Sequence, residues 1–181
     1  MLWQSYHRKL LALAENATFL TDSQREAGQS LQQEIADYQQ RINLWGGPGV
    51  GKTFLAHHLH HRAEGLYFSS AAPLRCPSAE VSPGSVVIID NAPHDRGSAR
   101  LIFGEMLWAG ASSVILVTRQ PIDDAVRRIE LGLTAQDLAQ IEAVMRQQFG
   151  DFPAEALSDY ERQRSGIWAR VRALSLGMAT K

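Results

Sequence analysis

Uninterrupted apolar runs alternate with helical stripes through the middle of the chain. Two of the runs, Val86–Ile89 and Val114–Val117, consist only of valine, isoleucine and leucine, which is typical of strands buried on both faces of a parallel sheet. Apolar residues at Ile42–Trp45 and Leu66–Phe68 predict two more strands, and a weaker strand is predicted at Arg128–Leu131. The pattern therefore predicts a sheet of several short strands.

Helices are predicted between these strands. One begins near Lys52 and stops at Gly65, and another spans Ser98–Ala109. Strands that alternate with helices form parallel sheets covered on both faces, because each connection must cross back over the sheet before the next strand starts. We therefore expect an α/β fold, a three-layer α/β/α sandwich with a mainly parallel sheet.

The two ends of the chain show helical patterns without strands. Near the N-terminus, Ser23 and Glu26 match a capping box, in which two side chains each satisfy a free backbone N–H at a helix start, and this helix should run to about Gln40. Thr134 with Asp137 repeats the pattern near the C-terminus. We expect three segments: an N-terminal helical extension at 1–40, a core at 41–132 and a C-terminal helical segment at 133–181.

Length, charge and cysteine content narrow the class of protein. The 181 residues fit one ordinary domain, and a formal net charge of -1 gives no overall field that would gather nucleic acid or an anionic membrane, although local patches remain possible. Cys76 has no second cysteine to pair with. The apolar patch Leu10–Ala14 is too short for a signal peptide or a membrane span. We expect a cytoplasmic protein with no membrane partner.

The segment after the first predicted strand fits the phosphate-loop pattern G-x-x-x-x-G-K-[ST]. Its residues are Gly46, Gly47, Pro48, Gly49, Val50, Gly51, Lys52 and Thr53. Glycines let backbone N–H groups curve around phosphate oxygens at the positive end of the next helix. Lys52 is expected to reach the β- and γ-phosphates and Thr53 to bind Mg²⁺, and Phe54 completes the predicted nucleotide-binding segment. The alternative is a glycine turn that binds nothing.

Asp90 directly follows the buried run Val86–Ile89. A carboxylate delivered by a strand beside a phosphate loop can hold the water shell of the metal, which is the Walker B arrangement. On its own, such an Asp could instead cap the next turn. Together with the loop, it predicts a site for ATP or GTP with Mg²⁺, whose metal ligands are Thr53 and Asp90.

These motifs resemble those of the P-loop NTPases over about residues 41–120, and more narrowly the division with an extra strand between the phosphate-loop strand and the Asp strand. Thr118 and Arg119 end the strand after Asp90. In AAA+ ATPases a polar residue at this place senses the γ-phosphate, and STAND switches carry a similar Thr-Arg ending. The resemblance implies that the catalytic site comprises Lys52, Asp90, Asn91, Thr118 and Arg119. Alternatively, Thr118 and Arg119 simply open a turn.

The sequence departs from the family at two points. Most hydrolysing AAA+ members carry a Glu after the Walker B Asp to polarise water, whereas this chain has Asn91, which cannot accept that proton near neutral pH. Glu105 could substitute only if its helix faced the γ-phosphate. Arg127 and Arg128 could act as arginine fingers in a ring, although two surface arginines are the favoured interpretation. The C-terminal segment is shorter than the usual lid, which puts ring formation in doubt.

Histidines offer a competing kind of site. His57 and His61 stand four residues apart on one predicted helix and could bind a metal, but no nearby acid or cysteine completes the ligand set, so an ordinary helix face is favoured. His94 follows Asp90 closely and could approach the nucleotide, although we interpret it as part of a surface loop.

Three functions fit these residues. The leading hypothesis is a small AAA+/STAND-like ATPase, resembling helicase loaders, whose nucleotide state controls binding to a protein partner, another copy of the chain or a nucleic acid. The second is a nucleotide or small-molecule kinase, which would need an acceptor site and an arginine-rich lid. The third is a nucleotide-binding subunit without turnover, which Asn91 favours.

Overall fold

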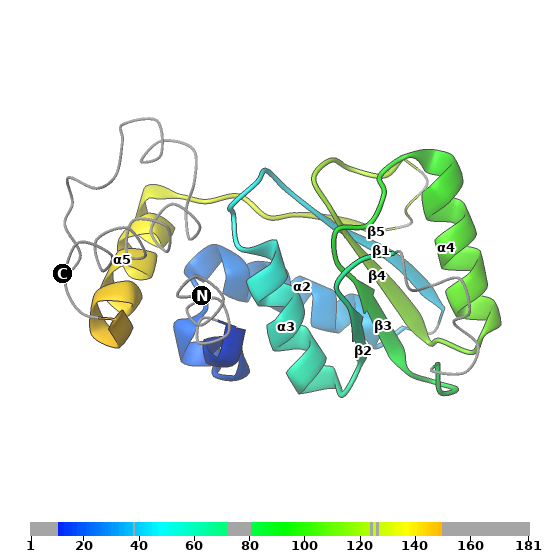
Figure 1. The fold of residues 1–181 in the computed structure, drawn as a ribbon, viewed down its shortest axis with the longest axis horizontal. Helices are drawn as coiled ribbons and strands as arrows, with labels where there is room; N and C mark the ends of the chain where they lie inside the picture. Colours follow the sequence, from blue (N-terminus) through cyan, green and yellow to red (C-terminus); the bar gives the residue numbers. More distant parts are fainter. Residues whose placement is uncertain (1–10, 38, 72–80, 124, 126, 150–181) are drawn as a thin grey trace, which may run out of the picture.

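A single parallel sheet forms the centre of the protein (Figure 1). The computed structural model describes residues 11–37, 39–71, 81–123, 125 and 127–149. The strands are β1 (Gln40–Trp45), β2 (Leu66–Phe68), β3 (Val86–Ile89), β4 (Ser113–Thr118) and β5 (Arg127–Glu130). They form a five-stranded sheet in the order β2-β3-β4-β1-β5, and every neighbouring pair is parallel. The α/β fold and the predicted strands are confirmed.

The strand order places β4 between β1 and β3. The strand that precedes the phosphate loop is therefore separated from the strand that precedes Asp90 by one extra strand, as the family resemblance implied. The carboxyl ends of parallel strands meet at one edge of the sheet, which is where α/β proteins bind ligands. This edge carries the phosphate loop, Asp90 and Thr118.

Helices cover both faces of the sheet and make the three layers (Figure 1). The helices α2 (Asp22–Ile35) and α3 (Lys52–Ala63) share one core with Val86 and Ile88 of β3. The helix α4 (Arg96–Trp108) shares the other core with Val87 and Ile89. Successive side chains of a strand point to opposite faces. A strand that contributes to two cores must be apolar throughout, which explains the uninterrupted runs in the sequence.

The start of α2 differs from the prediction. Its capping box joins Thr21 and Gln24 rather than Ser23 and Glu26. The Ser23 backbone N–H and hydroxyl both donate to Asp137 instead, at 3.0 and 2.6 Å. The Ser23 side chain therefore bonds to a residue distant in the sequence and does not cap its own helix. The predicted end near Gln40 is also wrong, because α2 stops at Ile35 and Gln40 already belongs to β1.

The helix α5 (Ala135–Phe149) lies beside α2, away from the sheet (Figure 1). The Thr134–Asp137 capping box is confirmed, since the Thr134 N–H donates to Asp137 Oδ2 at 2.7 Å and the Asp137 N–H donates to Thr134 Oγ1 at 3.1 Å. Burial acts to raise the pKa of Asp137, but the hydrogen bonds from Ser23 and Thr134 outweigh it and hold the pKa well below its ordinary value. One carboxylate thus joins the starts of α2 and α5.

Two short 3₁₀ helices, η1 (Leu13–Glu15) and η2 (Ala17–Phe19), precede α2. The buried His58 of α3 holds η1, because its Nδ1 lies 2.7 Å from the Ala14 carbonyl oxygen. The earlier N-terminal residues, Cys76 and the chain beyond Phe149 lie outside the described residues. Within the described part, no helix is both long and apolar enough to cross a membrane.

Candidate nucleotide-binding site

The phosphate loop connects β1 to α3, and two of its glycines are required by its shape. A Cβ at Gly46 would lie 2.2 Å from the Leu131 carbonyl oxygen, so no side chain fits there. Gly51, the N-cap of α3, has a φ of 90°, in the left-handed region that glycine adopts without strain. The loop therefore has a curved backbone that closely approaches the chain after β5.

The first turn of α3 points free backbone N–H groups at this loop. The first N–H groups of any α-helix have no acceptor within the helix, and here they belong to Lys52, Thr53 and Phe54. The Phe54 side chain is buried in the core beneath the sheet. Phe54 could therefore contribute only its backbone to an anion, whereas the helix end as a whole is suited to phosphate.

The Lys52 ammonium is held by the loop itself. Its Nζ donates to the carbonyl oxygens of Gly46 and Gly47, at 2.7 Å each. Burial lowers the pKa of Lys52 below its ordinary value; Asp90 opposes this effect, and the Arg119 charge adds to it. A phosphate arriving at the loop would supply a negative charge and stabilise the charged ammonium.

Thr53 and Asp90, the predicted metal ligands, lie together. Thr53 Oγ1 donates to Asp90 Oδ2 at 2.7 Å, although the residues are far apart in the sequence. Asp90 is 3% exposed and also accepts from the Asn91 backbone N–H, at 2.8 Å to Oδ1. A hydroxyl and a carboxylate are hard oxygen donors of the kind that Mg²⁺ prefers. The donor set at this point therefore fits the predicted ion.

Tyr67 of β2 is a member of the site that sequence analysis missed. Its hydroxyl donates to Asp90 Oδ2 at 3.1 Å. Burial raises the pKa of Tyr67, and the Asp90 charge raises it further, so the phenol stays protonated and remains a donor. The ring lies against His57, with ring centres 4.2 Å apart. Asp90 is thus positioned from two sides, by α3 and by β2.

The next residue, Asn91, adopts a φ of 49°. Its Nδ2 donates to the Ser69 carbonyl oxygen at 3.2 Å. Asparagine tolerates the left-handed region better than most residues, because its short polar side chain can bond locally. Asn91 therefore shapes the turn after β3 in addition to lining the site.

Thr118 and Arg119 differ in their availability. Thr118 is 2% exposed, and its hydroxyl donates to the Gln120 carbonyl oxygen while accepting from Asn43 Nδ2 at 2.9 Å. Arg119 is exposed. A γ-phosphate would have to displace an existing partner of Thr118, whereas the Arg119 side chain is accessible to it.

A pocket of about 450 Å³ opens over these groups. Its lining residues are Pro48, Gly49, Lys52, Thr53, Asp90, Asn91, Ala92, His94, Val117, Thr118 and Arg119. The pocket brings together the loop, the end of β3 and the end of β4. It also includes His94, which the sequence analysis interpreted as part of a surface loop. Within this lining, Asp90 is the one carboxylate among the described residues.

Two buried amide side chains outside the pocket bond to the elements that form the site. Gln24 of α2 donates through Nε2 to the Gly51 carbonyl oxygen at 3.2 Å, which ties α2 to the phosphate loop. Asn43 of β1 donates to the Leu116 carbonyl oxygen at 3.0 Å and accepts from the Ile122 N–H at 2.9 Å. Gln24 belongs to the Thr21–Gln24 capping box, but that pattern does not indicate a contact with the phosphate loop. No sequence motif marks Asn43, whose one signal was a polar side chain within a predicted strand.

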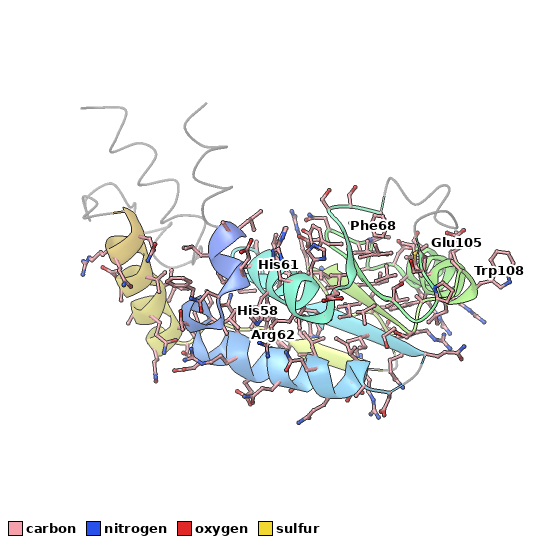
Figure 2. The ribbon with its side chains drawn as sticks, turned by 90° about the horizontal axis from the view of Figure 1, so that it is seen from below. His58, His61, Arg62, Phe68, Glu105 and Trp108 are labelled. Carbon is pink, nitrogen blue, oxygen red and sulfur yellow. The ribbon has the colours of Figure 1, made fainter. Side chains whose placement is uncertain are left out.

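The other polar candidates lie elsewhere. Arg127 Nε lies 2.8 Å from Glu34 Oε2, and Arg128 lies 4.0 Å from Asp123, while neither arginine lines the pocket. Glu105 lies on the outer face of α4, beside Trp108 rather than the phosphate loop (Figure 2).

The histidines of α3 make separate contacts. His61 lies 3.9 Å from Glu15, and His60 Nδ1 lies 2.5 Å from the Gly65 carbonyl oxygen. Across the described residues, no group of three or more His, Cys, Asp and Glu side chains could hold a metal ion. A metal at Thr53 and Asp90 would therefore take its remaining ligands from phosphate and water.

Comparison with solved structures identifies the fold. The structure of AMPPCP-bound DnaA from Aquifex aeolicus has a TM-score of 0.54 and 14% sequence identity, and the match covers 84% of this chain and 60% of that one. The fold is AAA+-like. DnaA bound to AMPPCP and single-stranded DNA matches at a TM-score of 0.53 and 15% identity, over 83% of this chain and 59% of that one.

A DNA replication initiation factor matches with a TM-score of 0.52 and 15% identity, over 89% of this chain and 64% of that one. The chain thus spans about three-fifths of the length of these AAA+-like structures. No protein-family model matches the sequence, and no curated protein matches it.

Proposed function

We propose that this protein binds ATP or GTP with Mg²⁺ at the phosphate loop, and that the bound nucleotide controls how tightly the protein binds a protein or nucleic-acid partner. The convergence of Lys52, Thr53 and Asp90 on one pocket supports the proposal most directly. Each is the residue type that its role requires: an ammonium for phosphate, a hydroxyl and a carboxylate for the metal. The ATP-analogue complexes of the AAA+-like DnaA structures are consistent with this use of the fold.

In the proposed complex, the backbone N–H groups at the start of α3 hold phosphate oxygens, and Lys52 leaves the carbonyls of Gly46 and Gly47 to meet them. Thr53 and Asp90 would hold Mg²⁺, which would neutralise part of the phosphate charge. Tyr67 keeps its hydrogen bond to Asp90 and so positions the carboxylate.

The γ-phosphate is the group that would distinguish the two nucleotide states. Lys52, Thr118 and Arg119 surround the pocket, and each would contact a triphosphate differently from a diphosphate. Only such differential contact can shift a conformational equilibrium. We assign the larger share of this differential contact with the γ-phosphate to Arg119, because the Thr118 hydroxyl is already bonded to Asn43 and Gln120.

Slow or absent hydrolysis is the second part of the proposal. Asn91 stands where hydrolysing relatives carry a Glu, and its amide donates to Ser69. An amide cannot accept a proton from water near neutral pH. Glu105 lies on the outer face of α4. These observations favour a switch that holds its nucleotide over an enzyme with rapid turnover.

The proposed partner is a nucleic acid or a protein. Single-stranded DNA accompanies AMPPCP in one of the AAA+-like DnaA structures, so a nucleic acid is one candidate. A protein partner, as for helicase loaders, is the other. A cytoplasmic location remains a prediction from the sequence.

The decisive experiment titrates a fluorescent ATP analogue into the whole chain in the presence of Mg²⁺. Lys52→Ala should weaken binding by roughly 100-fold, because an ammonium with charge-assisted hydrogen bonds to phosphate is lost. Arg146→Ala on α5 removes a cation far from the pocket and serves as the control. Equal titration curves for the original chain and Lys52→Ala would refute the nucleotide site. Phosphate release measured alongside, with and without single-stranded DNA, tests turnover.

A further inference from the structure

Asn43 is a polar side chain in the interior of an apolar sheet. It is fully buried in β1, the strand that lies between β4 and β5 (Figure 1). Its neighbours Ile42 and Leu44 belong to the core shared with α3, so Asn43 points to the opposite face, which α4 covers. Burying an amide is costly unless its polar atoms are bonded. The role of Asn43 should therefore be visible in its hydrogen bonds.

One end of the amide holds the chain that follows β4. Because β4 and β5 lie on opposite sides of β1, the connection between them must pass β1. It contacts the α4 face, where the Ile122 side chain is fully buried in the core shared with α4. The Ile122 N–H donates to Asn43 Oδ1 at 2.9 Å. Asn43 thus satisfies a buried backbone group of this connection.

The other end of the amide holds the end of β4. Asn43 Nδ2 donates to the Leu116 carbonyl oxygen at 3.0 Å and to Thr118 Oγ1 at 2.9 Å. A carbonyl oxygen can only accept a hydrogen bond and a backbone N–H can only donate one. The two backbone partners, Leu116 and Ile122, therefore fix the amide in one orientation, with its NH₂ group toward Thr118.

This orientation decides where the Thr118 hydroxyl proton goes. An NH₂ group is a donor without acceptor capacity, so Thr118 can only accept from Asn43 and must donate its own proton elsewhere. In the structure the proton goes to the Gln120 carbonyl oxygen. A hydroxyl proton rotates to suit its acceptors, and Thr118 lines the nucleotide pocket. The same proton is therefore available to a phosphate oxygen that enters the pocket.

Arg119 lies between the two points that Asn43 holds. Its side chain is exposed and lines the nucleotide pocket, while Thr118 before it and Ile122 after it are both bonded to Asn43. Ordering a long side chain and its backbone on binding costs entropy. A backbone that is already held in place lowers this cost. Asn43 thus prepares the turn from which Arg119 reaches the pocket.

We propose that Asn43 is a positioning residue for recognition of the γ-phosphate, because it directs both the Thr118 hydroxyl and the turn that carries Arg119. Asn43 does not itself line the pocket, so it acts through these two residues. The inference rests on the proposed nucleotide site and adds what sets its preference for a triphosphate over a diphosphate. A diphosphate at the phosphate loop lacks the group that Thr118 and Arg119 would contact.

Calorimetric titration of the whole chain with Mg²⁺ tests the proposal. The two ligands are ADP and AMPPCP, an ATP analogue whose γ-phosphate is not released by hydrolysis. Asn43→Leu keeps the approximate size of the side chain and removes the amide. It should lower the ratio of AMPPCP affinity to ADP affinity by about tenfold, the size of one hydrogen bond to a charged group, and leave the ADP affinity within about twofold. A purely structural role would not change this ratio.

Ser113→Ala is the matched control. Ser113 is fully buried at the opposite end of β4, and its hydroxyl donates to the Asp37 carbonyl oxygen at 3.4 Å. This variant also removes a buried polar group and should leave the ratio unchanged. Asn43→Ala is the second test variant, because it leaves a space in which a water molecule can satisfy Leu116 and Ile122, and it should lower the ratio as Asn43→Leu does. Urea unfolding establishes that each variant is folded.

Arg119→Ala shows whether Asn43 acts through its proposed target. Residues that act through one another give non-additive effects, so the double variant Asn43→Leu/Arg119→Ala should lose less than the product of the two single losses. Losses that multiply, or Asn43 variants that weaken both ligands equally, overturn the inference. An original chain that binds both ligands with equal affinity refutes the inference alone. A chain that binds neither ligand refutes the proposed nucleotide site and the inference with it.

Discussion

The phosphate-loop edge and the outer face of α4 contrast in how their chemical groups are satisfied. At the loop, Lys52 bonds to backbone carbonyls and Thr53 bonds to Asp90, so the polar groups already have partners within the chain. On α4, Leu101 and Trp108 face solvent. A polar site stays stable in the free protein only if its groups are paired, because unpaired buried groups are costly.

The contrast teaches what each surface requires of a ligand. A ligand at the loop must replace existing hydrogen bonds, which a phosphate and a metal ion can do because their charges make stronger ones. A partner at α4 needs only to displace water from apolar surface. We therefore expect nucleotide binding to rearrange local contacts at the loop.

The largest expected effect comes from the shape of the loop. Gly46→Ala places a Cβ against the Leu131 carbonyl oxygen, within 2.2 Å. The backbone on both sides must shift, which should lower the free energy of unfolding by about 3 kcal/mol and distort the phosphate site. Gly47→Ala is the matched control, since its Cβ meets only Val50 at 3.9 Å. Urea unfolding and nucleotide titration of both variants measure the difference; equal stability would show that the loop is not constrained by Leu131.

A smaller effect is expected at the metal. Asp90→Asn keeps the shape of the side chain but removes its charge, so Mg²⁺-dependent nucleotide affinity should fall by about tenfold, or about 1.4 kcal/mol. Binding without metal should change less. Asp123→Asn removes an exposed carboxylate outside the pocket and is the control. Parallel titrations with Mg²⁺ and with EDTA measure both; an equal loss in the two would argue against a metal at Asp90.

Much of the fold could be predicted from the sequence because the sheet has a hydrophobic core on each face. Strands such as β3 contribute alternate residues to both, and this leaves continuous apolar runs that few other structures produce. The capping residues of α2 could not be predicted from the sequence. Two overlapping patterns, Thr21–Gln24 and Ser23–Glu26, were equally plausible locally, and the choice between them depended on Asp137, which is distant in sequence.

The residues of the site also divide into those that the sequence predicted and those that it did not. Lys52, Thr53 and Asp90 belong to motifs, so their chemistry was visible in the chain, and the structure brings Thr53 and Asp90 into contact. Tyr67 was invisible because its role depends on the pairing of β2 with β3, which sets Phe68 beside Ile89 and the tyrosine hydroxyl near Asp90. Pairing between distant segments leaves no local pattern. The face of α4 was missed for a related reason, since exposure is a property of the folded chain.

The smallest expected effect has the opposite sign and tests the α4 face directly. Gly104→Ala adds a Cβ that meets nothing within 4 Å, so the gain in helix propensity should raise the free energy of unfolding by about 0.5–1 kcal/mol. The measurement is urea unfolding of both chains under the same conditions. Gly28→Ala on α2 is the matched control, because its Cβ would lie 3.3 Å from Leu55 Cδ1 and crowding should offset the gain. A Gly104→Ala variant no more stable than the original chain would contradict the open space around this position.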